Sequence, residues 1–84
     1  MKEIVVKSKN GIHARPASQI VEVAIRYSGD VFLIKDGKKY NGKSIMSIMS
    51  MGIQANELIS IEVIGDHATE LEVQLYKIIE SIVD

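Results

Sequence analysis

Residues 59–63 alternate strictly in polarity within a predicted strand at residues 58–64, and this pattern constrains the fold more than any other. Three branched apolar residues occupy alternate positions: Ile59, Ile61 and Val63. Polar residues, Ser60 and Glu62, separate them. Because successive side chains of a strand point to opposite faces of its sheet, one face is buried and the other meets water. The pattern predicts an antiparallel sheet whose helices all pack on one face.

Six further elements are predicted around this strand. We expect strands at residues 4–6, 31–35 and 38–41, and a helix at residues 16–27. Asp36 and Gly37 form a strong hairpin signal between the second and third strands. A short helix is expected between an N-cap at Ser44 and a C-cap at Gly52, and a last helix after an N-cap at Asp66. The predicted class is therefore α+β, in the order β-α-β-β-α-β-α.

Two helices carry an apolar stripe at helical spacing. The stripe of the first is Ala17, Ile20, Val21 and Ala24, and that of the last is Leu71, Leu75, Ile78, Ile79 and Ile82. A 3.6-residue period predicts that these side chains face the sheet. Val23 and Ile25 lie off the first stripe, so we expect them to be exposed.

A ferredoxin-like plait is the main alternative fold, because it shares the order β-α-β-β-α-β. The shortness of the middle helix and the additional last helix disfavour it. A plait-type RNA-binding domain would also need a pair of aromatic residues on one strand. The aromatic residues are Tyr27, Phe32, Tyr40 and Tyr76, and no predicted strand carries such a pair.

Size and composition exclude several classes of protein. The 84 residues allow a single domain over residues 1–84, and 46% of them are hydrophobic, as in a folded protein. A net charge of −1 disfavours a nucleic-acid binder, and the absence of cysteine suits a reducing cytoplasm. No segment has the apolar length of a signal peptide, or the ~18 residues of a membrane span. We expect a cytoplasmic protein without membrane insertion, metal or cofactor.

The single proline, Pro16, lies in a segment suited to binding an anion. Proline is favoured in the first turn of a helix, which places His13 just before the helix. We expect the N–H groups of Ala17 and Ser18 to have no intrahelical partner and to carry partial positive charge. Arg15 adds a full charge and a fork that fits phosphate oxygens. A neutral imidazole at this place could accept a phosphoryl group and hold it.

Two motifs resemble those of a known family. Residues 11–17, Gly-Ile-His-Ala-Arg-Pro-Ala, are similar to the active-site signature of the HPr family, the histidine-containing phosphocarriers of the bacterial phosphoenolpyruvate-dependent sugar phosphotransferase system. Residues 43–52 resemble the segment around the regulatory serine of that family. The motifs stand at the family's spacing, and the resemblance covers essentially the whole chain. It implies an open-faced β-sandwich, with a four-stranded antiparallel sheet and three helices on one face.

The resemblance also implies roles for single residues and partners. His13 would accept the phosphoryl group, on Nδ1 as the family suggests, and Arg15 would stabilise it. The donor would be Enzyme I, charged by phosphoenolpyruvate, and the acceptors would be sugar-specific EIIA proteins. Such a carrier is not itself an enzyme, and we expect a monomer. The second histidine, His67, lacks comparable neighbours and is expected to be a solvated surface residue.

Ser44 has two interpretations. Serine is among the best helix N-caps, which alone explains the residue. The resemblance adds a role as the target of an HPr kinase/phosphorylase, with phospho-Ser44 recruiting a transcriptional repressor. The alternative function is therefore a regulatory module that acts mainly through phospho-Ser44 in catabolite repression. A related group of catabolite-repression proteins lacks the phosphoacceptor histidine, so His13 argues against membership in that group.

The run from residue 45 to residue 51 is apolar on both faces of a short helix, which cannot bury both. We expect Ile48 and Met51 to point inward. Ile45, Met46 and Met49 are expected to be exposed, as a surface that docks several partners. In the family this docking surface lies beside the active histidine. Some family members carry lysines on the first helix, where this chain has Glu22 and Ile25, so charge complementarity would shift to Arg15, Arg26 and Lys43.

Overall fold

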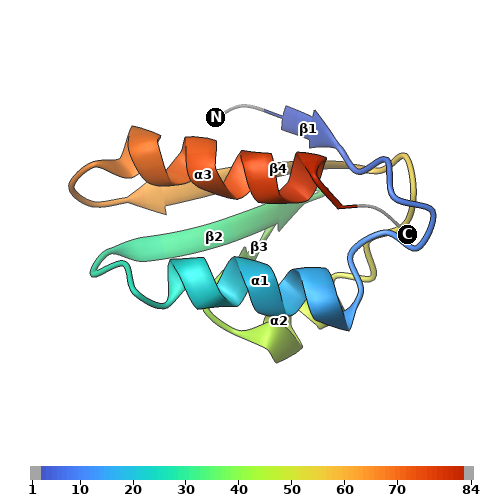
Figure 1. Cartoon of the computed structure of the whole chain (residues 1–84), viewed down its shortest axis with the longest axis horizontal. Coiled ribbons are helices and arrows are strands. Elements are labelled where there is room, and N and C mark those ends of the chain that lie inside the picture. The colour runs from blue at the N-terminus through green and yellow to red at the C-terminus, as the bar shows by residue number, and fades with distance from the viewer. Residues whose placement is uncertain (1–2, 83–84) are drawn as a thin grey trace.

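Four strands form one sheet, and three helices cover one of its faces (Figure 1). A computed structural model of the chain describes residues 3–82. The strands are β1 (Glu3–Val5), β2 (Asp30–Lys35), β3 (Lys38–Asn41) and β4 (Leu58–Ile64). The helices are α1 (Ala14–Ala24), α2 (Ile45–Ser50) and α3 (Ala68–Glu80).

The strand order is β1-β4-β2-β3, and every neighbouring pair is antiparallel. A ferredoxin-like plait also has an antiparallel sheet, but its first and third strands lie in the centre. Here β4 and β2 are the central strands, so the strand order excludes the plait. The predicted order β-α-β-β-α-β-α and the open-faced β-sandwich are confirmed.

The alternation predicted along β4 is confirmed by burial. Ile59, Ile61 and Val63 are buried in the core. On the neighbouring strand β2, Leu33 pairs with Ile61 and Val31 pairs with Val63, so that buried side chains form rows across the sheet. These rows and the apolar stripes of the helices belong to one core. Burial of this kind supplies the main driving force for folding.

The helix stripes pack as predicted, and two residues outside the stripes also pack into or against the core. All four stripe residues of α1 are buried, and those of α3 are buried or packed against the core: Leu71, Leu75, Ile78, Ile79 and Ile82. Tyr76 is buried as well, because its hydroxyl accepts the N–H of Ile61 at 3.1 Å. Ile25 is exposed as expected. The prediction for Val23 is wrong, since it is half-buried and packs against the core, beside Leu71 of α3.

The predicted boundaries of two helices are wrong. α1 begins two residues before Pro16, which is its third residue, and proline is equally tolerated there because the first-turn N–H groups are unpaired anyway. α1 ends early, where the Tyr27 N–H turns back to the carbonyl of Ala24. Asp66 does not cap α3. Its carbonyl accepts the Tyr27 hydroxyl at 2.6 Å, and the N-cap is His67, whose φ is +59°.

α1 and α3 lie side by side on the sheet and run in opposite directions (Figure 1). The start of α1 therefore meets the end of α3 at one end of the molecule. No helix within residues 3–82 is long and apolar enough to cross a membrane. The functional residues predicted from the sequence lie at the start of α1 and along α2.

Candidate functional site

His13 occupies the N-cap of α1, with an extended backbone at φ −100° and ψ −171°. Its side chain makes no capping hydrogen bond, so the ring is not used to satisfy the helix N-terminus. The half-buried residue lines a hollow of about 300 Å³ at the end of the molecule where α1 begins and α3 ends. The lining residues are His13, Arg15, Pro16, Gln19, Ser81 and Ile82.

Hydrogen bonds at the start of α1 decide which N–H groups are open to an anion. The Ala17 N–H donates to the His13 carbonyl at 3.0 Å. The prediction that Ala17 and Ser18 have unpaired N–H groups is therefore wrong, because α1 starts two residues earlier and both residues lie beyond its unpaired turn. The proline has no N–H. The first-turn N–H groups without an intrahelical partner are those of Ala14 and Arg15.

Positive charge gathers at this helix N-terminus. Arg15 is exposed beside His13, and its guanidinium can donate to two phosphate oxygens at once. The helix dipole adds partial positive charge at the same place. The first turn of α1 contains no acidic residue that would oppose an anion. The site is therefore suited to a phosphoryl group on or near the His13 ring.

The turn before His13 packs closely against the backbone carbonyl of Ile53. Gly11 has φ +63°, and a Cβ at this position would lie only 1.9 Å from the Ile53 carbonyl oxygen. The Ile12 N–H donates to the same oxygen at 3.4 Å. Glycine is needed here both for the left-handed backbone and for the close approach.

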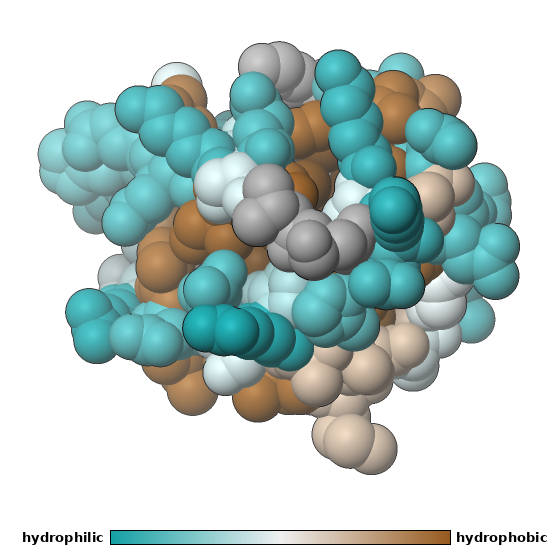
Figure 2. Space-filling model, turned by 45° about the vertical axis from the view of Figure 1, so that its right-hand side comes forward, coloured by the Kyte–Doolittle hydropathy of each residue, from teal (hydrophilic) through white to brown (hydrophobic). Residues whose placement is uncertain are grey.

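The two predicted faces of α2 are confirmed by exposure. Ile48 and Met51 are 1% and 4% exposed, whereas Ile45, Met46 and Met49 are 41%, 80% and 40% exposed. In Figure 2 the lower edge of the molecule, where α2 lies in Figure 1, is brown and tan. α2 packs against α1, whose N-cap is His13. We call Ile45, Met46 and Met49 the α2 apolar face.

Ser44 is the N-cap of α2, as predicted. Its hydroxyl oxygen accepts the Ser47 N–H at 3.1 Å, and the backbone is extended. The Ser47 hydroxyl in turn accepts the N–H of Asn41 at 2.9 Å, which ties the helix start to the end of β3. Ser44 is half-buried and directly precedes the α2 apolar face.

His67 lies apart from this site, at the start of α3 and thus at the opposite end of that helix (Figure 1). It is exposed, and its Nδ1 lies 3.3 Å from the Glu70 carboxylate. Within residues 3–82 no cluster of three or more potential ligands could hold a metal ion. Both histidines are helix N-caps, but Glu70 lies in the first turn after His67, whereas His13 has Arg15 beside it and no acidic residue in its first turn.

Three residues that line the hollow were not predicted from the sequence: Gln19, Ser81 and Ile82. Gln19 is one helical turn after Arg15, so the spacing along the predicted helix could have indicated it. Ser81 and Ile82 come from the end of α3. No local signal marks them, because their place beside His13 depends on the antiparallel packing of α1 and α3.

Residues 1–81 match the family described as PTS HPr component phosphorylation site. The chain belongs to the HPr family. This confirms the resemblance drawn from the His13 and Ser44 motifs, and it identifies the protein as a phosphocarrier of HPr type.

Individual HPr relatives agree with this assignment over nearly the whole chain. The HPr-like protein Crh of Halalkalibacterium halodurans is 40% identical over 79 residues, which are 94% of each chain. The solved structure of HPr-C-His from Thermoanaerobacter tengcongensis is 42% identical, with a TM-score of 0.86 over 96% of this chain and 93% of that one. Crh from Bacillus subtilis, solved as a dimer with a swapped domain, is 36% identical, with a TM-score of 0.77 over 100% and 97%.

Proposed function

We propose that the protein is a cytoplasmic phosphoryl carrier in sugar uptake. It accepts phosphate on His13 from Enzyme I, which is charged by phosphoenolpyruvate, and passes it to sugar-specific EIIA proteins. The observation that carries this proposal is the place of His13 at the N-cap of α1, beside Arg15 and two open N–H groups. Membership in the HPr family supports it.

In the proposed chemistry a phosphoryl group moves directly from the donor to the His13 ring, without a cofactor. A lone pair of the neutral imidazole attacks phosphorus, and the N–P bond to His13 forms while the bond from phosphorus to the donor breaks. The N–H groups of Ala14 and Arg15 and the Arg15 guanidinium donate to the phosphoryl oxygens. They replace Ala17 and Ser18 in this role. The phosphoramidate is labile, so the same steps in reverse deliver the group to the acceptor.

The α2 apolar face is proposed as the shared docking surface for donor and acceptors. Its three side chains are exposed and adjacent, as expected of a surface that loses water on binding. Phosphorylation of Ser44 by an HPr kinase/phosphorylase would add almost two negative charges next to this face. The modified residue would still lie at a helix N-terminus, so α2 would remain folded while docking weakens.

A regulatory role is the second candidate, because the chain is 40% identical to a protein named Crh. In that case phospho-Ser44 would recruit a transcriptional repressor, and transfer through His13 would be secondary. Crh of Bacillus subtilis was solved as a domain-swapped dimer. We propose that this chain, unlike that relative, acts as a monomer.

Labelling with phosphoenolpyruvate and Enzyme I tests the carrier against the regulator. The carrier acquires one phosphoryl group that is lost in acid and kept in alkali, and it passes this group to an EIIA protein. A protein that stays unlabelled, or whose label survives acid, would contradict the carrier function. Acid-stable label added only by a kinase and ATP would instead support the regulatory role.

A further inference from the structure

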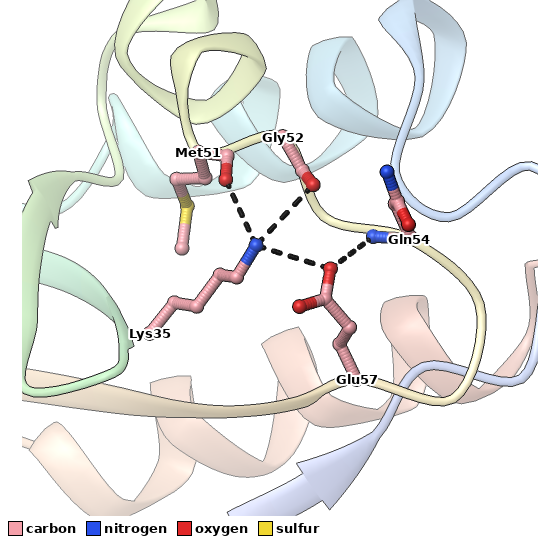
Figure 3. A network of polar contacts seen from close by, with 5 residues as sticks. All are labelled: Lys35, Met51, Gly52, Gln54 and Glu57. Carbon is pink, nitrogen blue, oxygen red and sulfur yellow. Dashed lines mark hydrogen bonds and ion pairs between the residues drawn. The ribbon is translucent and has the colours of Figure 1, made fainter.

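Lys35, the last residue of β2, binds three acceptors with one ammonium group (Figure 3). Its Nζ donates to the carbonyl oxygens of Met51 and Gly52, at 3.2 and 3.3 Å, and to Oε1 of Glu57 at 3.0 Å. The three N–H groups of a lysine are thereby matched by three acceptors. The side chain is only 15% exposed, so these three hydrogen bonds replace most of the water around the ammonium.

The acceptors lie at both ends of the segment from residue 51 to residue 57. Met51 and Gly52 end α2, where carbonyl groups lack helical partners and carry partial negative charge. Glu57 directly precedes β4, and its Oε1 also accepts the Gln54 N–H at 2.7 Å. This backbone hydrogen bond, together with the one from Lys35, lowers the pKa of Glu57 and keeps it ionised. One ammonium group thus fixes both ends of the segment.

The fixed segment supports the turn that presents His13. Ile53, in its middle, is buried and accepts the Ile12 N–H through its carbonyl. The same carbonyl is the group that Gly11 approaches so closely. A shift of Ile53 would therefore move the two residues that directly precede His13.

We propose that Lys35 and Glu57 are positioning residues for phosphoryl transfer at His13. This inference rests on the proposed function. Neither residue touches the phosphoryl group. They hold the Ile53 carbonyl against the turn before His13, and they hold the end of the helix that carries the docking face. Transfer requires the ring and the donor phosphorus to be aligned, and a displacement of 1 Å can slow an enzymatic step about a hundredfold.

The decisive variant is Lys35→Met, which keeps the aliphatic stem and removes the ammonium. Lys38→Met is the matched control, because Lys38 lies opposite Lys35 across the hairpin, is exposed and carries the same charge. Lys35→Arg retains a cation and serves as the conservative variant. Glu57→Gln keeps an oxygen acceptor and loses only the charge, so it remains usable if Lys35→Met folds poorly.

Two measurements distinguish a positioning role from a purely stabilising role. Both are made at a temperature at which circular dichroism shows that every variant is folded. The first is the transfer rate at saturating phosphorylated Enzyme I. We expect it to fall about tenfold in Lys35→Met and less in Glu57→Gln, to recover partly in Lys35→Arg, and to stay unchanged in Lys38→Met. The second is amide hydrogen exchange, in which the Ile12 N–H should exchange faster in Lys35→Met while the Ile61 N–H is unchanged.

The outcomes distinguish this inference from the proposed function. A lower melting temperature of Lys35→Met with an unchanged transfer rate would show a purely structural role and overturn the inference. An equal loss in Lys38→Met would also overturn it, because general charge steering would then explain the rate. If the wild-type protein accepts no phosphate at all, the proposed function fails, and the positioning role fails with it.

Discussion

Truncation of Ile48 and of Met46 to alanine should distinguish the buried face of α2, which stabilises the fold, from the exposed α2 apolar face, which is proposed to dock partners. Both changes shorten a large apolar side chain on the same helix, and both introduce a better helix former. Ile48 is 1% exposed, so Ile48→Ala should cost about 2–5 kcal/mol of unfolding free energy. A domain of 84 residues has about 4–13 kcal/mol in total. At 4–8 °C per kcal/mol, the melting temperature should fall by at least about 8 °C.

Met46 is 80% exposed, so Met46→Ala should change the unfolding free energy by no more than about 0.5 kcal/mol. It should instead weaken the binding of Enzyme I about fivefold or more, as expected for a residue of an apolar docking surface. Thermal melts and calorimetric titration of both variants provide the test. Equal melting temperatures would refute the assignment of the two faces. Unchanged Enzyme I affinity in Met46→Ala would refute the docking role.

Three further variants probe the site and its support. Gly11→Ala should destabilise the protein in urea clearly more than Gly37→Ala, because both have positive φ but only the Cβ at residue 11 meets a carbonyl oxygen. Hydrogen bonds from a backbone N–H and from Lys35 lower the pKa of Glu57, so its contribution to stability is present above the ordinary glutamate pKa and is lost as the pH falls through the lowered value. The stability gap between wild type and Glu57→Gln in urea should therefore be wide at pH 7 and narrow at pH 3. Arg15→Ala should slow phosphoryl transfer about a hundredfold, as for the loss of one oxyanion donor, without a change in melting temperature.

Local patterns predicted most of the fold. The expected strand at residues 58–64 coincides with β4, since alternation of polarity reports directly on a half-buried strand. Asp36 and Gly37 both adopt positive φ, as the hairpin signal requires. Proline does not fix the start of α1 to one residue, because it is tolerated at each of the first helical positions. Because α1 starts two residues earlier than predicted, the N–H groups without an intrahelical partner are those of Ala14 and Arg15, and not those of Ala17 and Ser18.

The parts that could not be predicted depend on contacts between distant segments. The capping pattern suggested Asp66 as an N-cap, but the Tyr27 hydroxyl binds its carbonyl and α3 starts one residue later. The approach of Gly11 to Ile53 joins two loops that no periodicity relates. Nothing in the sequence distinguishes Lys35 from Lys38 and Lys39 around the same hairpin turn. Only the pairing of β2 with β4 brings its ammonium to Glu57.

Site-specific labelling tests the central claim most directly. Wild type, His13→Ala and His67→Ala are incubated with phosphoenolpyruvate and Enzyme I, and their intact masses are measured under alkaline conditions. We predict a mass increase of one phosphoryl group in wild type and in His67→Ala, and none in His13→Ala, whose fold stays intact by circular dichroism. A labelled His13→Ala protein, or an unlabelled His67→Ala protein, would contradict the account of His13 as the phosphoacceptor.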